Sequence, residues 1–258
     1  MNLSEPPRRA GAYALDTFID AKNWDETADC VMAWARQRAS RYVCLCNVHS
    51  VVHARHHPDF ARVLDRADLC VPDGAPIALR LRQQGYSKQP RISGPDLTVK
   101  LLQRASDEGI SVFFYGGTAE TIDTLERTLS RLFPKLHLAG MMSPPFRPLS
   151  PQELTGHIAR INNSGAGILF VGLGCPKQES WMNANSSRIR AVSIGIGAAF
   201  NFLSGRMQRA PQWMQDLGLE WFHRLITEPR RLTMRYVVTN SYFLYWVAKE
   251  KVLRRRTR

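Results

Sequence analysis

Two short polar segments of this chain combine residue types that could bind and activate a substrate. The first is Val71-Pro72-Asp73-Gly74, and the second runs from Gly172 to Glu179. Each segment follows an apolar run that predicts a β-strand, and each precedes a pattern that predicts a helix. Because ligands of open α/β sheets bind at the carboxyl ends of the strands, we expect both segments along one edge of one sheet.

Asp73 is the residue of the first segment that could move a proton. A carboxylate at the end of a strand can act as a general base when burial raises its pKa toward the working pH. The alternative interpretation is a turn aspartate that caps the following helix, because Asp-Gly pairs are common in turns. The motif alone leaves both interpretations open.

The second segment offers groups that suit a phosphate. Backbone N–H groups at the start of a helix bind phosphate. The pattern Gly172-x-Gly174 resembles the beginning of a dinucleotide-binding sequence whose third glycine is missing, which is weak evidence. The sharper signal is the polar triplet Lys177-Gln178-Glu179, which we expect at the same sheet edge as Asp73.

Arginine, rather than a metal, is the expected partner of any diphosphate. Arg91 precedes the Ser93-Gly94 turn that opens a predicted helix, so Arg91 can face a phosphate there or be a solvated loop residue. No Asp-x-Asp pair follows a predicted strand, and the pair His49 and His53 lacks a further ligand at metal-binding spacing. We interpret these histidines as a helix surface and expect neither a metal nor a cofactor.

The order of predicted elements indicates an α/β fold. Short β-branched or aromatic runs predict strands at 42–47, 69–71, 111–115, 136–139, 167–171 and 191–196. Apolar residues at helical spacing predict helices at 48–67, 95–108, 118–133, 151–162 and 176–187. This alternation predicts a Rossmann-like, mainly parallel sheet with helices on both faces. We expect an N-terminal extension (1–24), a catalytic domain (25–205) and a helical C-terminal appendage (206–258).

The C-terminal fifth of the chain is strongly basic. The formal net charge is +13, and residues 206–258 hold twelve Lys and Arg against four Asp and Glu, a local charge of +8. Aromatic residues are interleaved with these charges. Such a segment suits nucleic acid, an anionic lipid surface or a phosphorylated substrate, and the alternative is a solvated surface that only aids solubility.

The cysteine content and the lengths of the apolar runs indicate the cellular compartment of the protein. Five cysteines in 258 residues predict reduced thiols of a cytoplasmic protein rather than a disulfide framework. The N-terminus lacks the apolar core of a signal peptide. The longest apolar run, at 236–248, is shorter than the roughly 20 residues that span a bilayer.

The ordered motifs between residues 47 and 231 resemble those of the bacterial WecG/TagA/CpsF glycosyltransferases. The first motifs of the match are Asn47-Val48, Ala67-Asp68-Leu69-x-x-Pro72-Asp73-Gly74, Arg91-x-x-Gly94-x-Asp96-Leu97 and Phe113-x-Tyr115-Gly116-Gly117. The later ones are Val171-Gly172-Leu173-Gly174-x-Pro176-Lys177-Gln178-Glu179, Gly195-x-Gly197-Ala198-x-Phe200, Arg209-Ala210-Pro211-x-Trp213 and Gly218-Leu219-Glu220-Trp221-x-x-Arg224-Leu225-x-x-Glu228-Pro229-x-Arg231. Their common order makes the resemblance specific.

The resemblance implies an inverting, metal-independent transferase that uses a UDP-sugar. Its acceptor would be a polyprenyl-diphosphate-linked saccharide at the cytoplasmic membrane face, in the synthesis of a cell-surface polysaccharide. By the same resemblance Asp73 is the general base. The implied contacts to the nucleotide sugar are Asn47, Arg91, Gly94, Gly116, Gly117, Gly174, Lys177, Gln178 and Glu179. The implied contacts of the appendage to the leaving diphosphate are Arg209, Arg224 and Arg231.

Donor, acceptor and oligomeric state stay open at this point. Donors of the UDP-ManNAc, UDP-ManNAcA and UDP-glucose type all agree with the resemblance, and Leu45 stands where many members have threonine. The alternative function is a nucleic-acid-binding α/β protein that uses the basic aromatic tail. That alternative leaves Asp73 and the ordered motifs unexplained, so we expect no nucleic-acid partner and a peripheral location on the anionic inner face of the membrane.

Overall fold

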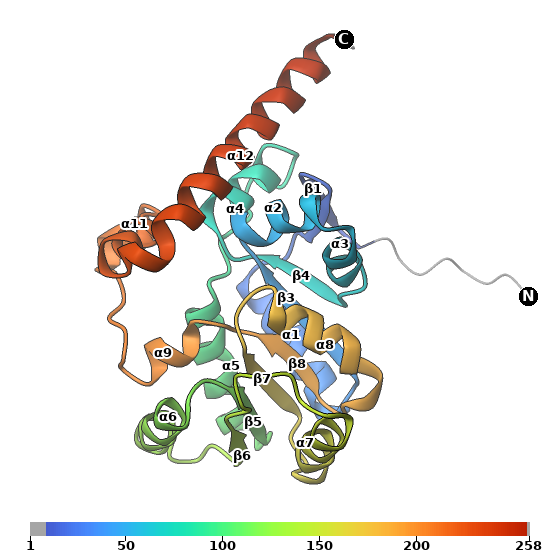
Figure 1. Ribbon diagram of the computed structural model, residues 1–258, viewed down its shortest axis with the longest axis vertical. Helices are drawn as coiled ribbons and strands as arrows, with labels where there is room; N and C mark the ends of the chain where they lie inside the picture. Colours follow the sequence, from blue (N-terminus) through green and yellow to red (C-terminus); the bar gives the residue numbers. More distant parts are fainter. Residues whose placement is uncertain (1–8, 257–258) are drawn as a thin grey trace, which may run out of the picture.

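The main sheet holds six parallel strands in the order β4-β3-β8-β7-β5-β6 (Figure 1). The computed structural model describes residues 9–256, without the side chains of Asp216, Arg231, Arg235 and residues 251–256. Within this range the strands of the sheet are β3 (Arg41–Cys46), β4 (Leu69–Pro72), β5 (Val112–Gly116), β6 (Leu138–Met142), β7 (Ile168–Gly172) and β8 (Val192–Gly195). The predicted strands and the mainly parallel sheet are confirmed.

Helices cover both faces of this sheet, as predicted. Neighbouring residues of a strand point to opposite faces, so Phe113 and Phe114 of β5 lie in two separate hydrophobic cores. The helices on the Phe114 side are α1 (Trp24–Arg36), α5 (Gly94–Glu108) and α6 (Ala119–Leu132). Those on the Phe113 side are α2 (Val48–His56), α3 (Pro58–Asp65), α7 (Pro151–Asn163) and α8 (Lys177–Asn185).

The single helix predicted at 48–67 is wrong, because the chain forms two helices there. Helix α2 ends at His56 and α3 begins at Pro58. A proline disfavours the helical conformation of the residue before it, and His57 is extended, with φ −131° and ψ 94°. The prediction also omitted α1 and the short helix α4 (Ala75–Arg82), which follows the Asp73-Gly74 turn.

An N-terminal hairpin packs against the edge strand β4. Its strands are β1 (Gly11–Ala14) and β2 (Thr17–Asp20). The buried carboxylate of Asp20 accepts a hydrogen bond from the backbone N–H of Cys70 at 2.7 Å and another from Arg9 Nε at 2.7 Å. Part of the predicted N-terminal extension is therefore a separate two-stranded sheet that packs against β4.

The C-terminal segment is helical and contacts the rest of the chain. Its helices are α10 (Gln212–Asp216), α11 (Glu220–Thr227) and α12 (Pro229–Arg256), and the short helix α9 (Ala199–Leu203) precedes it. Helix α12 packs along α2 and then extends past the body of the molecule (Figure 1). The Arg55 guanidinium lies 3.8 Å from the ring centroid of Trp246, and Arg80 of α4 forms an ion pair with Glu250. Among the described residues no helix is long and apolar enough to cross a membrane.

We predict that Gly116→Ala lowers the free energy of unfolding by about 2–4 kcal/mol. Gly116 has φ +133°, and a Cβ there would lie 2.5 Å from the carbonyl oxygen of Gly172 on the neighbouring strand. Urea denaturation measures the change. The matched control is Gly156→Ala within α7, where a Cβ meets no atom within 4 Å; it should stabilise the protein by about 0.5–1 kcal/mol. A Gly116→Ala protein as stable as wild type would contradict this close approach.

Candidate active site

Asp73 lies between the ends of two strands and the start of a helix. Its backbone N–H donates to the carbonyl oxygen of Cys46, the last residue of β3, at 2.9 Å. Its Oδ1 accepts a hydrogen bond from the backbone N–H of Gly94 at 3.0 Å. Gly94 begins α5 behind the N-cap residue Ser93. The carboxylate therefore faces the positive end of the dipole of α5.

The surroundings of Asp73 raise the pKa of its carboxyl group above the ordinary value. Burial is the main cause, and the negative charge of Glu220 acts in the same direction. The Arg91 guanidinium, the N–H of Gly94 and the side chain of Asn47 favour the charged form and oppose this shift. A raised pKa brings a carboxylate closer to the value that suits a general base.

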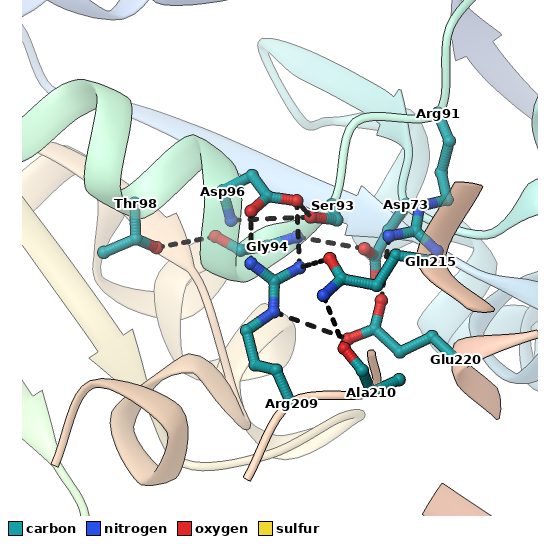
Figure 2. Close-up of polar contacts among 10 residues, drawn as sticks. All are labelled: Asp73, Arg91, Ser93, Gly94, Asp96, Thr98, Arg209, Ala210, Gln215 and Glu220. Carbon is teal, nitrogen blue, oxygen red and sulfur yellow. Dashed lines mark hydrogen bonds and ion pairs between the residues drawn. The ribbon is translucent and has the colours of Figure 1, made fainter. Parts of the chain in front are cut away.

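Charges of alternating sign connect this site to the C-terminal segment (Figure 2). Arg91 Nη2 lies 2.8 Å from Glu220 Oε2, and Arg209 Nε lies 3.9 Å from Glu220 Oε1. Arg209 also pairs with Asp96, with Nη2 3.1 Å from Oδ2, and donates to Gln215 Oε1 at 2.6 Å. These pairs hold α10 and α11 against the N-terminus of α5.

The two carboxylates at the start of α5 have pKa values shifted in opposite directions. Burial alone would raise the pKa of Asp96, but hydrogen bonds from Arg209 and Ser93 outweigh it and hold the pKa below the ordinary value. Asp96 is therefore committed to its ion pair, whereas Asp73 is the better base. A pair of carboxyl groups with separated pKa values is typical of sites that divide acid–base and electrostatic roles.

The polar triplet at the start of α8 is largely buried. Gln178 is 5% exposed and Glu179 is 1% exposed, whereas Lys177 is exposed. The Nε2 of Gln178 donates to Glu179 Oε1 at 2.9 Å. A Cβ at Gly195 would lie 2.9 Å from the same Nε2, so the Gln178 amide covers the end of β8. Two buried oxygens of this triplet have no hydrogen-bond partner among the described residues, Gln178 Oε1 and Glu179 Oε2.

Three of the four glycines predicted to contact the nucleotide sugar lie at a point where the connections between strands change direction, whereas Gly94 lies beside Asp73. Strand β5 is followed by the outer strand β6, whereas β7 is followed by the inner strand β8. This reversal between β5 and β7 is the kind of position where α/β proteins bind ligands. Gly116 and Gly172 pair at the ends of these strands, and Gly117 follows directly. Gly174 has φ +79° and no atom within 4 Å of an added Cβ, which leaves its backbone open.

The three appendage arginines occupy different surroundings. Arg209 belongs to the ion-pair network described above. Arg224 instead lies 3.6 Å from Glu228 Oε1, with its guanidinium 6.0 Å from the ring centroid of Phe202. Arg231 is part of α12, but its side chain lies outside the described residues.

Sequence reasoning missed three residues of the network, Asp96, Gln215 and Glu220. Asp96 and Glu220 occur in the same motifs as residues that were chosen, so carboxylates within arginine-containing motifs were the available signal. Nothing local predicts the pairing of Arg91 with Glu220, because these residues are 129 positions apart.

The histidines of α2 pack with neighbouring rings. The ring centroids of His53 and His57 are 4.1 Å apart, and those of His56 and Tyr242 of α12 are 5.0 Å apart. Across the part of the chain that the structure describes, no group of three or more His, Cys, Asp or Glu side chains is arranged to hold a metal ion.

A parallel sheet with helices on both faces and a polar site at the strand ends defines an α/β protein of the Rossmann-like class. The model of the glycosyl transferase WecG/TagA/CpsF family matches residues 12–257, nearly the whole chain. The chain belongs to this family, and it is therefore a transferase with a sugar donor and an acceptor. The match begins in the N-terminal hairpin and includes the C-terminal helices.

We predict that Asp73→Asn raises the free energy of unfolding at pH 7 by about 1 kcal/mol. Substitutions that remove an unfavourable charge from a functional site commonly stabilise a protein by this amount. Because the pKa of Asp73 is raised in the folded protein, its contribution to stability is most favourable at low pH and is lost as pH rises through that pKa. Urea unfolding from pH 4 to 8 should show a flatter profile for the variant. Asp59→Asn, at a side chain that is 94% exposed and pairs only at the surface with Arg62, is the control. A variant less stable than wild type at pH 7 would contradict the prediction.

Proposed function

We propose that this protein is an inverting, metal-independent glycosyltransferase of cell-surface polysaccharide synthesis. Its donor is a UDP-sugar of the UDP-ManNAc, UDP-ManNAcA or UDP-glucose type, and its acceptor is a polyprenyl-diphosphate-linked saccharide. The observation that carries the proposal is Asp73, a carboxyl group with a raised pKa beside Arg91 at the sheet edge of a glycosyltransferase-family chain. The raised pKa and the adjoining arginines suit a base that works next to a diphosphate leaving group.

In the proposed reaction Asp73 acts as the general base. It removes the proton from an acceptor hydroxyl group while that oxygen attacks C1 of the donor sugar. UDP leaves from the opposite face, which inverts the anomeric configuration. Proton transfer to a well-placed base contributes about 10²- to 10⁴-fold in rate.

Arginines then neutralise the charge that develops on UDP. Glu220 holds Arg91 in place, and Asp96 holds Arg209 in place. Arg91 also interacts electrostatically with Asp73, and Arg209 is linked to Arg91 through Glu220. Charge-assisted hydrogen bonds from a positioned guanidinium stabilise a diphosphate, because the donors are already oriented toward the developing charge. Arg224 and Arg231 are the further candidates of the appendage.

The nucleotide fits the glycine-rich strand ends. The backbone around Gly116, Gly117 and Gly174 lies at the reversal of the sheet, and the Gln178 amide lies over the adjacent strand β8. At Gly174, where an added Cβ would meet no atom within 4 Å, a ligand could approach the backbone closely. Asn47 caps α2 with its side chain and lies next to Asp73, between the base and this region.

The C-terminal helices fit an anionic membrane surface. Met234, Val237 and Leu244 are exposed along one side of α12, whereas Leu232 and Phe243 are buried on the other. Residues three to four positions apart share a face of a helix, so the exposed residues form an apolar stripe. Basic residues near such a stripe attract anionic lipid by about 1 kcal/mol each. This surface would bring the active site to a membrane-embedded acceptor on the inner face of the cell membrane.

We predict that Asp73→Asn lowers acceptor-dependent UDP release by at least about 100-fold. The assay offers a panel of UDP-sugars with a polyprenyl-diphosphate-linked monosaccharide in the presence of EDTA. Wild-type turnover should persist in EDTA, and the best donor identifies the sugar.

The matched control for this assay is Asp59→Asn, at a side chain that is 94% exposed, which should keep full activity. Full activity of Asp73→Asn would remove Asp73 from the role of base. Turnover that EDTA abolishes would contradict the metal-independent mechanism.

We predict that replacing the exposed stripe weakens binding to anionic vesicles. The double variant Met234→Ser/Leu244→Ser should sediment about tenfold less with phosphatidylglycerol vesicles, because it loses buried apolar area at the interface. The control Phe146→Ser/Leu132→Ser removes two large exposed side chains outside the C-terminal helices and should sediment like wild type. Equal loss in both variants would refute a specific role of α12.

A further inference from the structure

Only one end of the Gln178 side-chain amide forms a hydrogen bond in the structure. Its Nε2 donates to Glu179 Oε1 at 2.9 Å, but its carbonyl oxygen Oε1 is buried and has no hydrogen-bond partner among the described residues. Buried polar atoms are nearly always paired, and an unpaired one in a site calls for an explanation. We propose that Glu179 is a positioning residue that orients the Gln178 amide, so that its carbonyl oxygen accepts a hydrogen bond from the nucleotide sugar. This inference rests on the proposed function and assigns a role to Glu179 within it.

The Gln178 amide packs against two glycines, Gly195 and Gly197, at the end of the central strand β8. A Cβ at Gly195 would lie 2.9 Å from Gln178 Nε2, and a Cβ at Gly197 would lie 3.5 Å from Gln178 Oε1. The carbonyl end therefore lies toward the turn after β8. Strand β8 is flanked by β3, which leads to Asn47, and by β7, which leads to Gly174. The free carbonyl oxygen thus belongs to the same edge as the other predicted contacts.

The chemistry of the pair decides which end of the amide stays free. An ionised carboxylate can only accept hydrogen bonds, whereas an amide has a donor end and an acceptor end. The charged form of Glu179 therefore selects the orientation in which the Gln178 nitrogen faces it. The reversed orientation would place two oxygens together. The ligand group that meets Oε1 must be a donor, either a hydroxyl group or a ring N–H, and a nucleotide sugar carries both.

The protonation state of Glu179 controls this selection. Burial raises the pKa of Glu179, and the hydrogen bond from Gln178 and the thiol of Cys175 favour its charged form. Among the described residues, the thiols of Cys44 and Cys46 on β3 and of Cys70 on β4 also interact electrostatically with Glu179.

Helix α3, which also packs against α8, carries Asp59 and Arg62, and these residues pair with each other at the surface. Once protonated, Glu179 can also donate a hydrogen bond, so the reversed amide, with its carbonyl oxygen toward Glu179, becomes favourable and turns that oxygen away from the ligand. Affinity for the ligand should therefore fall as pH falls through the pKa of Glu179.

Calorimetric titration with UDP, UDP-glucose and UDP-N-acetylmannosamine between pH 5 and 8 tests the inference. The full chain with Asp73→Asn serves as the parent, so that titration of Asp73 does not contribute. In this parent, Glu179→Leu should bind about tenfold more weakly at pH 8, because it loses the charged acceptor that orients Gln178. Glu179→Gln should stay within about threefold of the parent at pH 8 and lose the decline at low pH.

Controls and outcomes separate this inference from the proposed function. Ser180→Ala, an exposed position of α8, should retain the parent's affinity and pH profile. The isosteric Glu179→Gln keeps the test decisive if thermal melting shows that Glu179→Leu is unfolded. An effect seen with UDP assigns the donor group to the nucleotide, whereas one seen only with the UDP-sugars assigns it to the sugar.

Two results would overturn the inference. If the parent binds UDP but both Glu179 variants match Ser180→Ala in affinity and pH profile, Glu179 does not position Gln178 and the proposed function stands. If the parent binds none of the three ligands, the proposed function fails and the role of Glu179 fails with it.

Discussion

Charge compensation at the N-terminus of α5 constrains the rest of the site. An arginine is always charged, and a charge in a partly buried position is costly unless it is paired. Arg91 meets this requirement with Glu220, and Arg209 meets it with Asp96 and Glu220. Because Glu220 begins α11, this pairing attaches α11 to the site, whereas α12 is held by its contacts with α2 and α4. Asp73 adds a half-buried carboxyl group to the cluster; its burial raises its pKa, and the Arg91 guanidinium opposes this shift.

The same ion pairs position the arginines of the proposed diphosphate site. Arg91 and Arg209 are positioned by carboxylates before any phosphate arrives, which reduces the reorganisation that transition-state stabilisation requires. A diphosphate would compete with Glu220 and Asp96 for these guanidinium groups. In the proposed function, diphosphate affinity and the attachment of α11 would therefore be coupled, because both use the same cations. Such coupling is a property of the whole network rather than of a single residue.

The local sequence predicted the sheet and the polar residues at the carboxyl ends of its strands. It did not predict which residues pair with one another there. Buried parallel strands are short apolar runs, so each strand of the main sheet was recognisable. The break at His57 was available from the proline that follows it, but a continuous apolar pattern obscured it. Asp73 and Gln178 were predicted from their positions after strands. The pairing of Arg91 with Glu220 depends on how α11 packs, and local patterns hold no information on such packing.

The dimensions of the sheet relate the base to the proposed nucleotide position. Asp73 follows β4 at one side of the sheet, whereas the reversal lies between β7 and β5. These positions are three to four strand spacings apart, or about 14–19 Å at about 4.8 Å per spacing. This span is on the scale of an extended nucleotide sugar. A uridine at the glycine-rich strand ends would therefore direct its diphosphate along the edge, past Gln178, with the sugar toward Asp73. In the proposed function, one nucleotide sugar would therefore occupy both ends of the edge.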